Sequence, residues 1–251
     1  MRASRGLVPA AVVMAALGCA APASAQADRD RVRISVDAGV QLSSIAFDTT
    51  AARLVYLENA SIGTSYRVRR GPLTDGGISI RLAGNFGVGL TVSSFMAKND
   101  GAVSAALPHP FFFKTPRTVT GTAPDLRRDE LVTHLQAIYT VRPGEKVDVA
   151  VSAGPSFFRV RQDVVTDIAF SDSYPYDAPA LTSAATQRVS ANRIGFNGGV
   201  DVGVRLSRHA GLGGRARFSR ATVTLAMPNG GATVSTDAGG VQLAGGLRLY
   251  F

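Results

Sequence analysis

The feature that most constrains the fold is a strict alternation of residue types at the end of the chain. Every second residue belongs to a mainly apolar set: Val241, Leu243, Gly245, Leu247, Leu249 and Phe251. The residues between them are Gln242, Ala244, Gly246, Arg248 and Tyr250. Because successive side chains of a β-strand point to opposite faces, this pattern predicts a strand with one apolar face and one polar face.

The same alternation recurs along the chain in segments of strand length. Residues 32–42 show it, and six further segments lie at 76–83, 86–97, 128–141, 147–161, 191–206 and 210–224. A tilted membrane strand needs about 9–11 residues, and the short segment at 76–83 can begin earlier, near Tyr66. No run approaches the roughly twenty apolar residues of a membrane helix. Eight segments are an even number, which lets the first strand close against the last.

The connections between these segments alternate between short and long. Short ones lie at 84–85, 142–146 and 207–209, and long ones at 44–75, 98–127, 162–190 and 225–236. Short turns on the periplasmic side and long loops outside are typical of membrane barrels. We therefore predict an all-β fold, an antiparallel up-and-down transmembrane β-barrel of eight strands. A soluble periplasmic β-protein is the alternative, but it leaves the apolar strand faces and the terminal Phe251 unexplained.

The first 25 residues have the order of a secretory signal peptide. Arg2 and Arg5 precede an apolar stretch at 7–20, and Ala23-Ser24-Ala25 provides a cleavage site. We expect residues 1–25 to be removed and 26–251 to form the barrel domain. A membrane anchor and lipidation at Cys19 are the alternatives. Since Cys19 is the only cysteine, the exported part has no thiol for catalysis, disulfides or metal binding. Its net charge falls from +9 to +7 with the loss of two arginines.

The signal peptide, the eight segments and the ending Gly246-Leu247-Arg248-Leu249-Tyr250-Phe251 together resemble the small outer-membrane β-barrel proteins of the OmpA/OmpX-like type. The resemblance implies a location in the outer membrane of a Gram-negative bacterium. It also implies that Phe251 is the signal read by the barrel-assembly machinery, and that periplasmic chaperones accompany the chain. Its oligomeric state stays open.

The alternation assigns many charged and polar residues to the inside of the barrel. They are Arg33, Asp37, Arg81, Glu130, His134, Gln136, Asp148, Arg193, Asp201, Arg205, Arg215, Arg217 and Arg248. In a narrow barrel such long side chains fill the interior and pair, because an unpaired buried charge is costly. A plugged barrel is the first expectation. A small pore is the alternative, and the excess of arginine would make it prefer anions.

No motif indicates an enzyme, a cofactor or a metal site. His134 and Glu130 share one strand face, and Ser152 and Ser156 follow on the next strand, which permits a barrel enzyme that modifies lipid A as a further alternative. However, no G-x-S-x-G or H-E-x-x-H motif occurs, and His109 and His209 lie far apart in the expected topology. The expectation is a non-enzymatic barrel without cofactor or metal.

The long loops contain the candidate contact residues. Aromatic and basic side chains concentrate there: Phe111, Phe112, Phe113, Lys114, Arg117, Arg127, Arg128, Tyr174 and Tyr176. The aromatic rings suit a partner surface, and the cations suit the phosphates of lipopolysaccharide. Nucleic acid is not expected, because the chain is exported and its arginines are scattered. The sequence thus predicts a structural or surface-interaction role.

Overall fold

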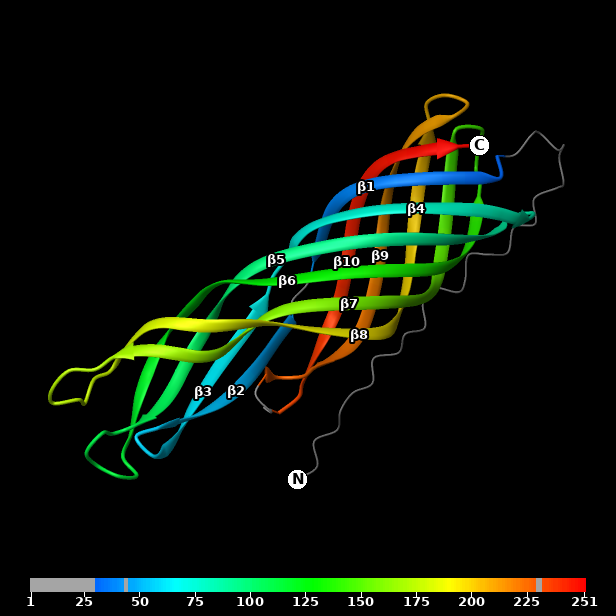
Figure 1. The fold of residues 1–251 in the computed structure, drawn as a ribbon. Coiled ribbons are helices and arrows are strands. Elements are labelled where there is room, and N and C mark those ends of the chain that lie inside the picture. Colours follow the sequence, from blue (N-terminus) through cyan, green and yellow to red (C-terminus); the bar gives the residue numbers. More distant parts are fainter. Residues whose placement is uncertain (1–29, 43–44, 229–231) are drawn as a thin grey trace, which may run out of the picture.

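The computed structural model describes residues 30–42, 45–228 and 232–251, which form ten β-strands (Figure 1). The expected signal peptide lies outside these residues. The strands are β1 Val32–Leu42, β2 Ile45–Val55, β3 Glu58–Val68, β4 Gly71–Ala83, β5 Phe86–Pro108, β6 Pro116–Val141, β7 Val147–Ser171, β8 Ala180–Arg205, β9 Ala210–Leu225 and β10 Val234–Tyr250. In the described ranges no helix is long and apolar enough to cross a membrane.

Eight of these strands close into a ring, as the sequence predicts. Each pairs antiparallel with its neighbours in the order β1-β4-β5-β6-β7-β8-β9-β10, and β10 returns to β1. Short connections separate β4 from β5, β6 from β7 and β8 from β9, all at the end of the barrel where the C-terminus lies (Figure 1). This end is therefore the periplasmic one.

The register of the ring fixes the slant of the strands. We start at Val32 on β1 and step from each residue to its paired partner on the next strand. One full circuit of the barrel ends at Leu42 on β1, ten residues further along the chain. A stagger of ten residues over eight strands corresponds to a tilt of about 40°. Such a barrel is narrow enough for its own side chains to fill.

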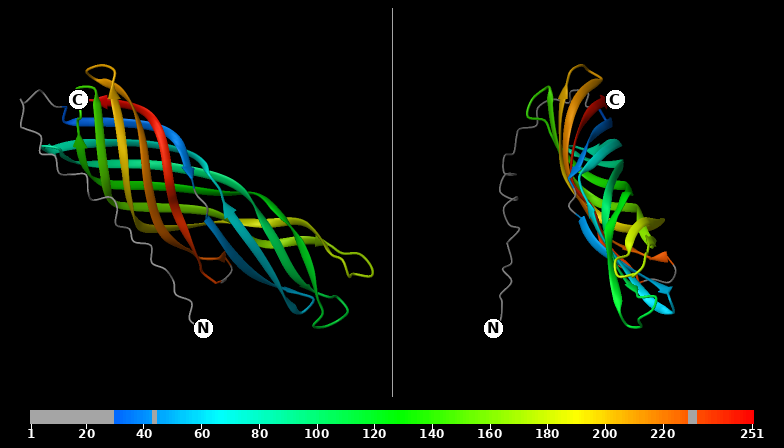
Figure 2. Two further views of the ribbon diagram at one scale, coloured as in Figure 1. Left: turned by 180° about the vertical axis from the view of Figure 1, so that it is seen from behind. Right: turned by 90° about the vertical axis from the view of Figure 1, so that its left-hand side faces the viewer.

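The region expected as the first long loop, 44–75, is mostly strand. β2 and β3 form a hairpin there, and β3 pairs with the outer part of β5 from Ser61↔Ala106 to Ser65↔Ala102. Tyr66 belongs to this hairpin, and β4 begins at Gly71. The other expected long loops also shorten, because β5, β6, β7 and β8 run on for 23 to 26 residues. The barrel therefore continues as a β-sheet extension beyond the membrane (Figure 2).

The position of the membrane surface is marked by an inversion of the hydrophobic pattern within single strands. Along β5 the outward residues are apolar from Phe86 to Met96 except for Ser94, and they are polar or small from Lys98 onward. The inward ones change from Thr91 and Ser93 to Phe95 and Val103. Outward apolar residues face lipid, whereas inward apolar residues form the core of a protein in water. We place the membrane boundary on β5 next to Met96. On β7 the outward residues change from apolar to polar between Phe157 and Arg159.

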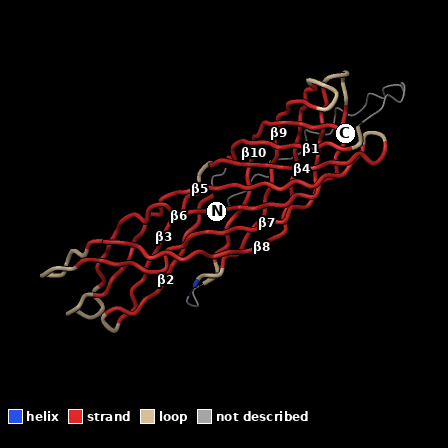
Figure 3. The backbone as a smooth tube through the Cα atoms, turned by 45° about the horizontal axis from the view of Figure 1, so that its top comes forward, coloured by secondary structure: helices blue, strands red, loops and turns tan. Residues whose placement is uncertain are grey.

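The extension has a sheet of β2, β3, β5 and β6, with the outer parts of β7 and β8 lying across it (Figure 3). Pairing of β6 with β7 stops at Arg128↔Gln162, so the two strands separate above this level. The hydroxyl of Tyr66 accepts a hydrogen bond of 2.7 Å from the backbone N–H of Val165, which ties the hairpin to β7 across the core. A contiguous hydrophobic core fills the extension.

Candidate functional site

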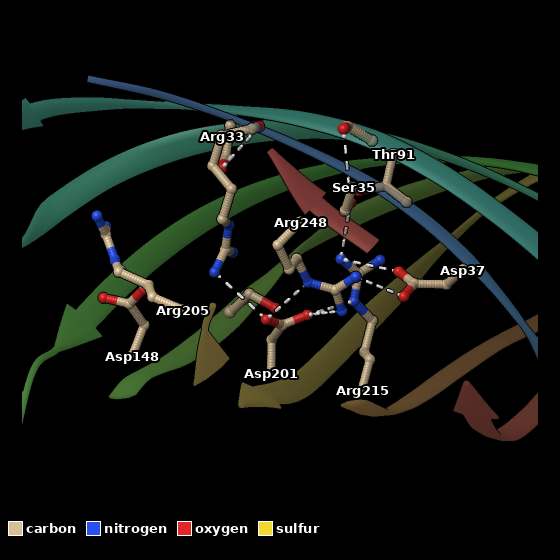
Figure 4. Close-up of polar contacts among 12 residues, drawn as sticks. Arg33, Ser35, Asp37, Thr91, Asp148, Asp201, Arg205, Arg215 and Arg248 are labelled. Carbon is tan, nitrogen blue, oxygen red and sulfur yellow. Dashed lines mark hydrogen bonds and ion pairs between the residues drawn. The ribbon is translucent and has the colours of Figure 1, made fainter. Parts of the chain in front are cut away.

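A network of arginine and aspartate side chains fills the middle of the barrel (Figure 4). At its centre, the fully buried Arg248 donates hydrogen bonds to Asp37 at 2.5 Å and to Asp201 at 2.7 Å. Arg215 donates to Asp75 at 2.5 Å and to Asp201 at 3.1 Å. These residues come from β1, β4, β8, β9 and β10, so the network joins opposite walls of the barrel.

Two further arginines complete the network. Arg217 forms an ion pair with Asp75 and donates a hydrogen bond of 2.7 Å to Gln242. Arg33 lies 3.3 Å from Asp201. Glycines in the wall make room for these long side chains: a Cβ at Gly213 would come within 2.7 Å of Nε of Arg248. The alternation of large and small inward residues therefore fills the narrow barrel.

Ion pairs also close both ends of this network. On the periplasmic side, Asp148 accepts hydrogen bonds from Arg142 at 2.7 Å and from Arg205 at 3.2 Å. On the outer side, Arg128 and Glu130 form a fully buried pair at 2.7 Å. Gln41 donates to the second oxygen of Glu130 at 3.1 Å. The charged layer thus extends through much of the barrel.

Two small voids lie in the polar lumen formed by the described residues, and an apolar layer covers this lumen on the outer side. A cavity of about 40 Å³ opens at the periplasmic end, and one of about 20 Å³ lies beside Asp201 and Arg215. Spaces of this size hold a few water molecules at most. Toward the outside, the buried side chains of Phe95, Phe158 and Val160 belong to the hydrophobic core of the extension. An ion would have to pass both the charged network and this dry layer.

His134 lies inside the barrel with both ring nitrogens occupied. Its Nε2 is 3.0 Å from the hydroxyl of Ser93, and its Nδ1 is 2.8 Å from that of Ser156. In the described part of the chain, no carboxylate is recorded in contact with its ring, since Glu130 pairs with Arg128 instead. Ser152 accepts a hydrogen bond from Gln136. The arrangement is a hydrogen-bonded layer of the lumen, without the acid of a catalytic triad.

Comparison with known proteins supplies the family. A model of the outer membrane protein beta-barrel domain matches residues 11–248. The chain belongs to this family. It is an outer-membrane β-barrel protein of a Gram-negative bacterium.

Solved structures of outer-membrane proteins resemble this barrel at low sequence identity. The outer membrane protease OmpT from Escherichia coli aligns over 91% of this chain and 99% of its own, with 10% identity and a TM-score of 0.49. Neisserial surface protein A covers 88% and 97%, with 15% identity and a TM-score of 0.37. The attachment invasion locus protein Ail of Yersinia pestis covers 87% and 99%, with 9% identity and a TM-score of 0.34. No curated relative matches the sequence.

The structure brings most of the expected lumen residues of this outer-membrane barrel together, with one exception. Arg193 is exposed, because β8 pairs with β9 only from Phe196 toward the periplasm and therefore has a free edge at Arg193. Its placement in the lumen is wrong. Arg81 is half-buried near the periplasmic cavity. Asp75 was missed by the sequence reasoning, although it shares the inward parity of Arg81 on β4.

The aromatic loop residues meet at the tip of the extension, where three hairpins end. Phe111, Phe112 and Phe113 are 64–74% exposed, and Tyr174 is 85% exposed. The rings of Phe111 and Tyr176 contact edge to face at 5.5 Å between centroids. The backbone N–H of Lys114 donates to the side chain of Glu58, the first residue of β3, at 3.0 Å. The tip is therefore a joint surface of three connections.

Two of the expected basic contact residues are internal. Arg117 is buried and pairs with Asp172 at 2.7 Å, while it also donates to the carbonyl of Pro108 at 2.9 Å. Arg128 is fully buried beside Glu130. Neither is available to an external ligand, so these two assignments are wrong. Arg117 connects β6 with Asp172 near the tip, and Arg128 lies in the lumen beside Glu130. Arg127 is partly exposed and lies near the membrane boundary, far from the tip.

Proposed function

We propose that this barrel does not conduct and that its function lies on the outside, where it anchors a rigid β-sheet extension with an aromatic tip for contacts with surface partners. The single observation that supports this most is the double closure of the lumen. Arg248 is held between Asp37 and Asp201, and the apolar core of the extension lies above.

The competing proposal of an anion pore finds less support in the geometry. The arginines that would attract anions are paired: Arg215 and Arg217 share Asp75, and Arg248 and Arg33 share Asp201. An anion entering from outside would also have to move from water into the apolar layer around Phe95 and Phe158, which is energetically costly. The proposal of a lipid A-modifying enzyme also has little support from the geometry, because His134 is fully buried and lacks a carboxylate partner among the described residues.

The tip has the features of a contact surface rather than of a mobile loop. His109 accepts hydrogen bonds from the backbone N–H groups of Phe111 and Phe112 at 3.1 and 3.2 Å, which fixes the start of the aromatic run. Arg117 and Asp172 hold the two aromatic loops together. Rings that are exposed and already ordered lose little conformational freedom on binding. This favours docking of a partner at the tip.

Planar-bilayer recording of detergent-refolded protein tests the proposal, with the gel shift between boiled and unboiled samples as proof of folding. The folded barrel is expected to give no conductance steps, while a general porin added to the same membrane gives large ones. Reproducible steps with anion preference from folded protein would overturn the closed-barrel proposal.

A further inference from the structure

A patch of basic residues lies on the outer surface directly above the apolar membrane band. It contains Lys98 on β5, Arg127 on β6, Arg159 and Arg161 on β7, and Arg188 on β8. All are exposed except Arg127, which is half-buried. The patch begins where the outward pattern changes from apolar to polar. We call these five residues the basic belt.

The strand register places the belt residues side by side. Lys98 pairs directly with Arg127, and Arg161 lies opposite Asp129 of β6 and Ser190 of β8. Arg159 lies opposite Leu131 and Asn192. Residues two apart on one strand are about 7 Å apart and point to the same side, so Arg159 and Arg161 project together from β7. The belt is thus one continuous surface over four strands.

The belt keeps an excess of positive charge after its internal ion pairs are counted. Its acids are Asp129, which accepts from Arg127 at 2.8 Å and lies 3.5 Å from Arg188, and Asp163, which accepts from Arg188 at 2.9 Å. The hydrogen bond to Asp163 raises the pKa of Arg188 above its ordinary value. Asp100 is a third acid, since it shares the outward parity of Lys98 on β5, and five cations against three acids leave a net charge of about +2. Among the described residues, no ion pair is recorded for Lys98, Arg159 or Arg161.

A groove adjoins the belt at the free edge of β8. It is lined by Leu131, Phe157, Arg159, Asn192, Arg193 and Ile194. Phe157 is 51% exposed and Ile194 is 70% exposed, so their apolar surfaces face the lipid. The groove therefore combines guanidinium groups above with apolar side chains below. The same feature explains why Arg193, whose parity is inward, is exposed.

We infer that the basic belt and its groove bind the phosphorylated headgroup of an anionic glycolipid of the outer leaflet, with Arg159 and Arg161 contacting phosphate and the acyl chains lying on Phe157 and Ile194. Arginine binds phosphate through paired hydrogen bonds, and a cation near an anionic lipid surface adds about 1 kcal/mol of attraction. The inference rests on the proposed role at the outer surface and names one partner of it.

On the β9–β10 side of the outer surface, an exposed arginine is paired with an acid. On β9, the exposed Arg220 pairs with Asp237 of β10 at 2.6 Å, and Thr222 donates to the same carboxylate at 3.2 Å. Arg220 is therefore a matched control, because it is an exposed arginine of the outer surface whose charge is already neutralised. The contrast predicts that glycolipid binding depends on Arg159 and Arg161 and not on Arg220.

Lysine and arginine at the tip do not fit this ligand. Along β5, Leu107 lies nine residues beyond Lys98, about 30 Å further along the strand. Lys114 follows it at the tip, too far from the bilayer to reach the phosphates of a lipid embedded there. The phosphate contact expected for the loops therefore belongs to the belt, and of the expected residues only Arg127 lies in it.

Native mass spectrometry of the detergent-solubilised protein with bisphosphorylated lipid A tests the inference. The double variant Arg159→Gln/Arg161→Gln is expected to bind lipid A about thirtyfold more weakly, because two contacts of about 1 kcal/mol each are lost. Arg220→Gln is expected to bind within about twofold of the parent protein. Monophosphorylated lipid A is expected to bind more weakly than the bisphosphorylated form, and millimolar inorganic phosphate is expected not to compete.

The outcomes separate cleanly. Equal binding by the double variant would overturn the belt as the site, and competition by inorganic phosphate would show a general anion site instead of a lipid site. The gel shift verifies that each variant is folded, which is expected for substitutions of exposed residues. A conducting barrel that still binds lipid A would overturn only the closed-barrel proposal, whereas a silent barrel whose double variant binds normally would overturn only this inference.

Discussion

At the scale of single residues, Arg248 has the largest consequences for stability. It is fully buried and contacts both Asp37 and Asp201. Removing one member of a buried ionic group leaves charges without compensation, which costs about 3–5 kcal/mol. We expect Arg248→Met to lower the free energy of unfolding by this amount in urea titrations of the protein in lipid vesicles, followed by the gel shift.

The exposed pair of Arg220 and Asp237 provides the control for that measurement. Both side chains are more than a third exposed, so Arg220→Met is expected to cost less than about 1 kcal/mol. Equal losses for the two variants would contradict a structural role for the lumen network.

The sequence reveals the lumen residues only where strand boundaries are also known. Arg248 and Asp37 follow from the alternation, because their strands are framed by apolar neighbours on both sides. Asp75 was missed because β4 starts at Gly71, before the apolar residues that mark its membrane part. Arg193 was misplaced because parity alone does not reveal that β8 loses its partner β9 at this level.

At the scale of elements, the membrane parts of the strands were predictable and the extension was not. Outward apolar residues such as Val88 and Leu90 give a clear signal. Beyond Met96 the pattern inverts, and the outward positions of β5 hold Lys98, Asp100 and Ser104. A segment with polar outward residues is easily taken for a loop if membrane strands are identified by apolar outward residues. This pattern is nevertheless normal for a strand in water.

Limited trypsin digestion of intact cells distinguishes an ordered extension from long loops. Lys98 and Arg127 are paired partners within β5 and β6, whereas Lys114 lies in the connection between these strands. Cleavage requires local opening of the backbone, which hydrogen bonds within a sheet oppose. We expect trypsin to cut after Lys114 well before it cuts after Lys98 or Arg127, as read by mass spectrometry of the fragments. Simultaneous cleavage at all three would show that the outer parts of β5 and β6 are loops in the cell.

At the scale of the whole molecule, the barrel depends on the seam between its first and last strands. β1 pairs with β10 from Arg33↔Tyr250 to Leu42↔Val241, and Val32 and Phe251 exchange two backbone hydrogen bonds of 2.9 Å at the periplasmic end. The side chain of Phe251 is not needed for these bonds, and the residue is 58% exposed. The ring of Phe251 lies 6.4 Å from the ring of His209 and is otherwise largely exposed, so we expect it to contribute little to stability and keep the prediction that it is recognised during assembly.

Replacing Phe251 with serine separates these two roles. The backbone hydrogen bonds to Val32 remain possible, so we expect Phe251→Ser to refold in detergent with an unchanged gel shift and urea midpoint. In cells we expect several-fold less of the variant to reach the outer membrane, measured as the heat-modifiable fraction of envelope protein, with Leu249→Ala as a control that trims the lipid-facing surface of the same strand. Loss of refolding in detergent would instead place Phe251 among the residues that stabilise the seam. If the variant assembles normally in cells, the alternation of β10 is sufficient for recognition and the ring of Phe251 is not required.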